Sequence, residues 1–284
     1  MVADKARVQS REFHFDDEDF RFVARLVKEK TGIVLADHKR DMVYGRLARR
    51  LRNLGLTTFK DYTDMIQGPD GDKELGSFVN ALTTNLTKFF RENHHFEHLG
   101  QTAIPMVRER QRRNPEKRLR IWSAGSSSGE EPYSIAMTVR NALPNMKDWD
   151  ARILATDIDT DMLTKGARGI YEKERAENIP PEYRSKYADE QPNGGIQLKP
   201  SVRDMISFKR LNLLGKWPMK GPFDIIFCRN VVIYFDKPTQ KVLFDRYADL
   251  LHDDGFLYVG HSENLFNVTD RFKLIERSTY KKTY

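Results

Sequence analysis

The sequence predicts an α/β domain built on a mainly parallel sheet, preceded by an all-helical domain and interrupted by a small β-subdomain. Three observations support this prediction. Apolar residues recur at helical spacing through the first part of the chain. An apolar stretch ending near Ala124 leads into a Gly/Ser run and then a helical pattern. Further strand-like runs then alternate with amphipathic segments, which is typical of strand–helix–strand units.

Composition limits the class of protein. The 284 residues suffice for one large or two smaller domains, and 31% charged with 39% hydrophobic residues is typical of a soluble globular protein. The net charge of +7 favours acidic partners. Cys228 is the only cysteine, which excludes an internal disulfide and a cysteine-based zinc cluster.

Hydropathy indicates a cytoplasmic protein without direct membrane insertion. The stretch Met1 to Glu18 is polar and has no secretory signal pattern. The longest apolar run, Phe223 to Phe235, is interrupted by Arg229 and falls short of the ~20 residues that span a bilayer.

Residues 1–92 are expected to form the helical domain, and residues 93–118 a linker and helix. Helix starts and ends alternate along the domain: starts at Asp16 or Asp17, Asp37, and Thr57 or Thr58, and ends at Gly32 and Gly55. The second helix is strongly basic, and Arg46, Arg49 and Arg50 share one face of it at i, i+3 and i+4. This face is either simply solvated or contacts an acidic partner.

A polar stretch closes the helical region. Asn85 and Thr87 are poor helix-interior residues but good hydrogen-bonding ones, so the stretch could cover a ligand. His94 and His98 share a helix face, yet no third well-spaced ligand accompanies them. We therefore expect no metal site.

The Gly/Ser run lies within Ile121 to Ala136, a strand, turn and helix typical of the first unit of a nucleotide-binding domain. Gly125 and Gly129 would let the backbone approach a ligand closely. Glu130 and Glu131 stand where a phosphate-binding loop has Lys, and would repel a pyrophosphate. They suit a cationic ligand such as S-adenosylmethionine. Alternatively, they only favour the helix N-terminus.

Polar residues follow the later strands as well. Asp157 ends the second strand, where such folds bind ribose hydroxyls, and Asp159 is expected to cap the next helix. Asn212 ends the third strand, and Arg229 with Asn230 follows the fourth. Residues from about 170 to 207 are interrupted by Pro and Gly, which predicts an inserted β-subdomain.

Several long motifs occur in order along the chain: N-A-L-T-T-N-L-T-K-F-F-R-E (80–92), G-E-E-P-Y-S-I-A (129–136), A-T-D-I-D (155–159), F-D-I-I-F-C-R-N-V-V-I-Y-F (223–235) and G-H-S-E-N (260–264). With these motifs, the chain resembles the CheR-type methyltransferases of bacteria, which methylate glutamates of chemotaxis receptors. The resemblance implies a Rossmann-like S-adenosylmethionine-dependent methyltransferase domain at 119–284, with the insertion at about 170–207.

The resemblance also implies the site residues. The cofactor would be bound by Asn85, Thr87, Arg91, Glu131, Asp157, Asn212, Leu213, Arg229 and Asn230. Glu131 would hold the methionine amino group, Asp157 the ribose, and Asn212 with Leu213 the adenosine. Tyr234 would face the reacting centre. Arg91 and Tyr234 would orient the acceptor, which is already ionised at neutral pH because its pKa is near ~4.3.

The implied partners are the cytoplasmic, glutamate-bearing helices of receptors, which the basic face at Arg46, Arg49 and Arg50 would attract. In the family, the insertion can hold a receptor's C-terminal peptide as an extra strand; its compactness here favours action without such a tether. We expect a monomer that does not bind nucleic acid. Two alternatives stay open, an RNA methyltransferase and a cofactor-binding regulatory module without turnover.

Overall fold

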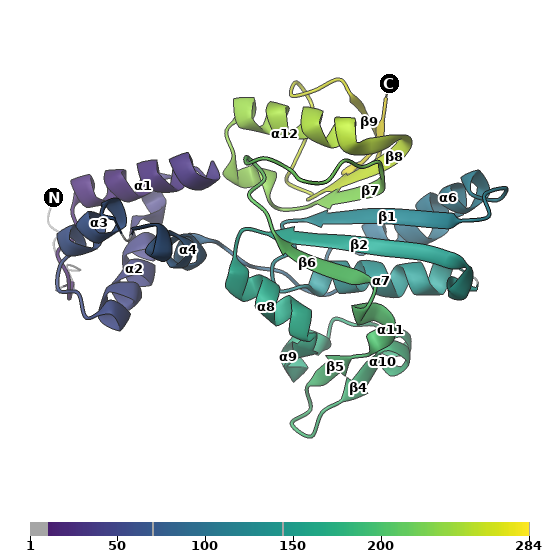
Figure 1. The fold of residues 1–284 in the computed structure, drawn as a ribbon, viewed down its shortest axis with the longest axis horizontal. Coiled ribbons are helices and arrows are strands. Elements are labelled where there is room, and N and C mark those ends of the chain that lie inside the picture. Colours follow the sequence, from purple (N-terminus) through teal and green to yellow (C-terminus); the bar gives the residue numbers. More distant parts are fainter. Residues whose placement is uncertain (1–10, 70, 144, 284) are drawn as a thin grey trace, which may run out of the picture. The chain divides into compact units, whose positions relative to one another are not determined.

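The computed structural model describes residues 11–69, 71–143 and 145–283. The chain divides between Thr84 and Asn85 into two compact units (Figure 1). The first ten residues, which include most of the polar N-terminal stretch, lie outside the described residues. No helix in the described part of the chain is both long and apolar enough to cross a bilayer.

The first unit is all-helical, with α1 (Asp17–Thr31), α2 (Arg40–Leu54), α3 (Phe59–Gln67) and α4 (Gly71–Leu82). The Asp16 carboxylate caps α1 by accepting two backbone N–H groups, and Gly32 ends it in the left-handed conformation. Asp37 was expected to cap the second helix. Instead a 3-10 turn (Asp37–Lys39) precedes α2, which has no side-chain cap.

The second unit contains a seven-stranded sheet in the order β6-β2-β1-β7-β8-β10-β9 (Figure 1). The strands are β1 (Lys117–Ala124), β2 (Trp149–Asp157), β6 (Ile206–Arg210), β7 (Phe223–Cys228), β8 (Leu251–Val259), β9 (Phe272–Glu276) and β10 (Thr279–Lys282). The first five in this order are parallel, and β10 pairs antiparallel with β8 and β9. Every residue of β7 is buried, as expected for a central parallel strand.

Helices cover this sheet. They are α5 (His94–His98), α6 (Ile104–Arg110), α7 (Glu130–Ala142), α8 (Thr160–Arg168) and α12 (Lys237–Leu250), with a π-helical turn (Leu99–Ala103) between α5 and α6. The helices α7 and α8 pack against β2 and β6, and α12 packs against β8. A 3-10 turn, η4 (Val232–Tyr234), follows β7.

The insertion forms a three-stranded antiparallel sheet in the order β3-β5-β4. Its elements are β3 (Ile170–Tyr171), α9 (Lys173–Ala176), α10 (Pro181–Tyr187), β4 (Ala188–Glu190), β5 (Ile196–Leu198) and α11 (Pro200–Arg203). Its aromatic residues join the main core, where Tyr171 contacts Phe89 with ring centroids 4.8 Å apart.

The polar segment 85–92 belongs to the second unit, so the division lies before the boundary expected at residue 92. Phe89 and Phe90 explain this position, because both are buried in the core of the second unit. The backbone N–H of Phe90 also donates to Ser134 Oγ of α7 at 3.0 Å.

Candidate functional site

The predicted site residues of the second unit lie in the segments that follow β1, β2, β6 and β7, or in the segment 85–92. These four strands are parallel, so their carboxyl ends meet at one edge of the sheet. Ligands of open parallel sheets bind at this edge.

The Gly/Ser turn after β1 has three residues with positive φ: Gly125 at 81°, Ser127 at 47° and Gly129 at 99°. A Cβ at Gly125 would overlap Val231, and a Cβ at Gly129 would lie 2.9 Å from Gly166 Cα. The packing of the protein itself therefore requires both glycines. Close approach of the backbone to a ligand, which the sequence predicts, is a separate reason for them.

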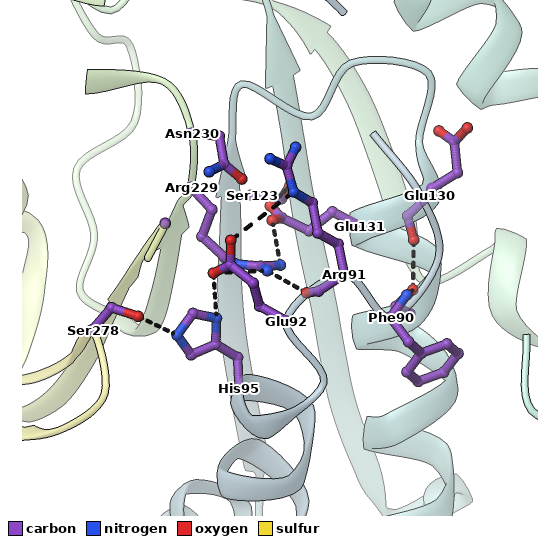
Figure 2. Close-up of polar contacts among 12 residues, drawn as sticks. Phe90, Arg91, Glu92, His95, Ser123, Glu130, Glu131, Arg229, Asn230 and Ser278 are labelled. Carbon is purple, nitrogen blue, oxygen red and sulfur yellow. Dashed lines mark hydrogen bonds and ion pairs between the residues drawn. The ribbon is translucent and has the colours of Figure 1, made fainter. Parts of the chain in front are cut away.

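Glu131 lies in the first turn of α7 with its carboxylate fixed on both oxygens. Ser123 Oγ donates to Oε1 at 2.8 Å, and Arg229 Nη1 donates to Oε2 at 3.1 Å (Figure 2). Burial raises the pKa of Glu131, and the Arg229 guanidinium opposes this shift. The result is a preorganised buried carboxylate at the end of β1.

Glu130 does not take part in this arrangement, and its carboxylate is bound by other residues of the protein. Figure 2 shows its side chain directed away from Glu131. Its carboxylate accepts hydrogen bonds from Ser128 Oγ at 2.7 Å and from Arg175 of the insertion. The hydroxyl of Tyr171 donates to Ser128 O at 2.8 Å, so two residues of the insertion hold this turn.

Arg229 is the centre of the polar cluster, with only 2% of its side chain exposed. Its guanidinium donates to the backbone O of Arg91, lies 3.3 Å from Glu92 Oε2, and pairs with Glu131 (Figure 2). The Phe96 ring packs against it at 5.6 Å. Two carboxylates therefore offset the cost of burying this cation. Arg229 thus links helix α7 to the segment that precedes helix α5.

The segment 85–91 is tied to the same edge. Asn85 Nδ2 donates to Asp159 Oδ2 at 2.7 Å, and Ser127 Oγ donates to the backbone O of Asn85 at 3.2 Å. Arg91 Nη1 donates to Leu86 O at 2.9 Å and so closes a loop around the half-buried Thr87.

Asp157 at the end of β2 is held by backbone groups. Ser127 N–H donates to Oδ2 at 2.7 Å and Asp159 N–H donates to Oδ1 at 2.9 Å. Burial raises the pKa of Asp157, and these N–H groups oppose the shift. Asp159 caps α8 as predicted, and it also positions Asn85, a role that its place in the sequence did not indicate.

Asn212 and Leu213 follow β6. Asn212 Oδ1 accepts the Leu214 N–H at 3.0 Å, which closes a tight turn. Leu213 O accepts from Trp217 Nε1 at 3.0 Å and from Arg246 Nη1 at 2.8 Å. These contacts fix the start of the loop between β6 and β7 against α12.

Asn230 and Tyr234 lie in the loop after β7. Asn230 has a φ of 59°, and Tyr234 is half-buried at the end of η4. The buried Glu263 accepts the backbone N–H of Asn230 at 2.8 Å. The sequence shows Glu263 only as part of the motif at 260–264, and no spacing signal there indicates its role.

His94 and His98 are the first and last residues of α5, at the i, i+4 spacing that the sequence indicates. His98 Nδ1 lies 2.7 Å from Tyr258 Oη, whereas the possible metal-ligand atoms of Glu92, His94 and His95 lie within 4.8 Å of one another. A cation there would face the Arg229 guanidinium, which is already 3.3 Å from Glu92 Oε2. The absence of a metal stays a prediction.

His95 is expected to make the fold acid-sensitive. Burial, followed by the charge of Arg229, lowers the pKa of His95 to about 3, against about 6.5 in an unfolded chain. Its contribution to stability is therefore complete above about pH 6.5 and is lost as the pH falls toward 3, by up to about 1.4 kcal/mol per pH unit. In urea denaturation at several pH values, His95→Gln should flatten this decline and the exposed control His38→Gln should not. Equal declines in both variants would contradict the assignment.

The basic helix α2 forms as the sequence predicts, but Arg46 and Arg50 do not lie on its exposed face. Arg46 Nη1 donates to the backbone O of Leu82 at 3.0 Å at the end of α4. Arg50 pairs with Glu74, whose side chain is 8% exposed, and Tyr62 Oη donates to the same carboxylate at 2.9 Å. Arg49 alone of the three is exposed.

Arg50→Ala should destabilise the full chain by about 3 kcal/mol, since it leaves the buried Glu74 carboxylate without its cation. Arg49→Ala removes the same charge from the exposed side of α2 and should change the free energy of unfolding by less than about 0.5 kcal/mol. Urea denaturation measures both. Similar losses in the two variants would show that the ion pair is not what stabilises the helices.

The parallel sheet, the glycine turn after β1, the acid at the end of β2 and the fixed carboxylate of α7 together define a Rossmann-like domain that binds a nucleoside cofactor. Residues 85–281 match the family described as "CheR methyltransferase, SAM binding domain", and residues 18–83 match "CheR methyltransferase, all-alpha domain". The chain belongs to the CheR methyltransferase family.

Similar proteins cover nearly the whole chain. It is 45% identical over 269 residues to the "Chemotaxis protein methyltransferase" of Escherichia coli, covering 93% of this chain and 90% of that one. It is 44% identical over 262 residues to the "Probable chemotaxis protein methyltransferase" of Rhizobium etli, covering 91% and 97%. These matches confirm the resemblance, the predicted fold class and S-adenosylmethionine as cofactor, and they favour neither of the two alternatives.

Proposed function

We propose that this enzyme transfers the methyl group of S-adenosylmethionine to glutamate side chains on cytoplasmic helices of chemotaxis receptors, forming methyl esters for sensory adaptation. The family match over both units carries this proposal, since relatives matched over most of their length are chemotaxis protein methyltransferases. We also propose that the enzyme is a cytoplasmic monomer and that it does not bind nucleic acid.

The residues of the site fit the cofactor, which supplies an electrophilic methyl group on a sulfonium when bound. Glu131 offers a fixed carboxylate to the α-amino group. Asp157 retains lone pairs for the ribose hydroxyls beyond the two backbone N–H bonds that orient it. Ser126 Oγ in the same turn is buried and has no partner in the described part of the chain, which supports a ligand contact there.

The remaining assignments complete the cofactor site. Asn212 and Leu213, at the start of a loop fixed against α12, would contact the adenosine. The other residues assigned to the border of the site are Asn85, Thr87, Arg91, Arg229 and Asn230. The contacts of Arg229 support a further role, in which it holds the Glu131 carboxylate in place for the amino group.

The chemistry requires orientation rather than a base. The acceptor glutamate is ionised at neutral pH, so no proton has to be removed before the carboxylate oxygen attacks the methyl carbon. We assign Arg91 and Tyr234 to orient that carboxylate in line with the methyl–sulfur bond. A guanidinium and a phenol can both donate hydrogen bonds to a carboxylate.

Receptor binding is proposed to use Arg49, the exposed member of the three predicted arginines of α2, rather than the whole face predicted from the sequence. Association with a glutamate-rich receptor fragment should weaken as salt rises, because solvent-exposed charges are screened. Arg49→Glu should weaken it further, whereas Arg112→Glu, on the segment after α6, should not. A salt-independent association measured by calorimetry would contradict this assignment.

Labelled methyl transfer tests the function. The enzyme is incubated with methyl-labelled S-adenosylmethionine and either receptor-containing membranes or total RNA. We expect label in receptor protein that alkali releases, because methyl esters hydrolyse in base whereas N-methyl groups do not. Label in RNA that alkali does not release as methanol, or cofactor binding without transfer to receptors, would overturn the proposal.

A further inference from the structure

Glu263 joins the ends of two adjacent strands through backbone hydrogen bonds. It follows β8 and is only 5% exposed. Its Oε2 accepts the N–H groups of Gly260 at 2.6 Å and Asn230 at 2.8 Å, and its Oε1 accepts those of Val231 at 2.8 Å and Ile233 at 3.2 Å. One side chain thus satisfies four backbone donors.

These donors determine the shape of the loop after β7. That loop carries Asn230 and Tyr234, and three of its N–H groups converge on the Glu263 carboxylate. Asn230 adopts a φ of 59°, in the left-handed region that Asn tolerates better than most residues other than glycine. This conformation occurs where the loop leaves the strand.

Gly260 restrains the same residue from the other side. A Cβ at Gly260 would overlap the side-chain amide of Asn230. Asn230 is therefore held on two sides. The Glu263 carboxylate binds its backbone N–H, and the Gly260 backbone lies against its side-chain amide. This geometry leaves the Asn230 amide little freedom to shift.

Four converging donors require an ionised acceptor. A carboxylate has about four lone-pair sites and no donor, whereas a glutamine amide would direct an NH₂ group at backbone N–H groups. Burial raises the pKa of Glu263, and the four N–H groups oppose that shift. The buried charge is thus stabilised only while the loop keeps its conformation.

We propose that Glu263 is a positioning residue for methyl transfer: it holds the loop after β7 so that Asn230 and Tyr234 present their side chains correctly to the cofactor and the acceptor. This inference rests on the proposed function for the roles of Asn230 and Tyr234. Glu263 itself acts only through the backbone of residues 230–233 and makes no contact with either ligand. No base or proton transfer is assigned to it.

Steady-state kinetics with Glu263→Gln tests the proposal, after the wild-type enzyme has been shown to methylate receptors. We expect kcat to fall at least ~10-fold, the effect of losing about 1.4 kcal/mol of transition-state stabilisation. The Kd for S-adenosylhomocysteine should rise by a smaller factor than kcat falls, because Asn230 is only one of the residues assigned to the cofactor and Glu131 and Asp157 are untouched. Glu276→Gln, an exposed acid on β9, is the matched control and should leave both values unchanged.

A double-mutant cycle separates positioning from a general structural role. If Glu263 acts through Tyr234, Glu263→Gln combined with Tyr234→Phe should reduce kcat scarcely more than the worse single variant. Gly260→Ala keeps the Glu263 carboxylate but displaces Asn230, so it should also lower kcat, and it serves as the test if Glu263→Gln does not fold. Additive effects in the cycle, or unchanged kcat in an active wild-type background, would overturn the inference while leaving the proposed function intact.

Discussion

Glu131→Gln is expected to remove most of the affinity for S-adenosylmethionine. The substitution keeps the volume and one acceptor for Ser123 Oγ, but it removes the negative charge that would pair with the α-amino group of the cofactor. A hydrogen bond to a charged group is worth about 1.5–3 kcal/mol, so the Kd should rise roughly 10- to 150-fold. Calorimetry with S-adenosylhomocysteine, which retains the amino group, measures the change without turnover.

The pH dependence gives a second measure of the same carboxylate. Because burial raises the pKa of Glu131, protonation at acid pH removes its charge and should weaken cofactor binding as the pH falls. Glu131→Gln should lack this component. The exposed Glu182→Gln is the matched control and should bind as the wild type does. Affinity in Glu131→Gln equal to that of the control would remove Glu131 from the cofactor site.

Tyr234→Phe should lower turnover much more than it weakens cofactor binding. The phenol is placed on η4, half-buried in the loop that Glu263 holds. Removal of one oriented hydrogen bond to the acceptor carboxylate should cost about 1.5–3 kcal/mol in the transition state, or roughly a 10- to 150-fold loss of kcat.

Rapid-quench methyl transfer to receptor membranes measures this step, since it separates chemistry from product release. Tyr183→Phe, in the insertion, provides a control for loss of a phenol outside the site. Arg91→Ala should show a similar kcat loss, with a larger change in Kd because Arg91 also closes the loop through Leu86. Unchanged turnover in both Tyr234→Phe and Arg91→Ala would remove them from the mechanism.

The fold was predictable because its signals are local or periodic. The strand, glycine turn and helix around Gly125, the acid ending β2 at Asp157, and the cap at Asp159 all follow from neighbouring residues. The strand after residue 223 was recognisable as fully buried from its unbroken apolar run. These signals also located the sheet edge that carries the site.

The contacts that organise the site were not predictable, because each joins residues far apart in the sequence. Glu130 pairs with Arg175 of the insertion, and Arg50 pairs with Glu74 of another helix. Helical spacing shows which residues share a face, but it does not show which charged side chains are covered by a neighbouring element. Glu263 was missed for the same reason, since its partners belong mostly to the loop after β7.

The insertion has a consequence for how the enzyme could be shortened. Arg175 neutralises the wholly buried Glu130, and Tyr171 binds the turn that precedes it. An enzyme lacking residues 170–203 would leave the buried Glu130 without its cation and would lose the Tyr171 hydrogen bond to the turn after β1. The insertion therefore stabilises the main domain independently of any receptor contact. A shortened version of this enzyme has to retain the insertion or replace Glu130.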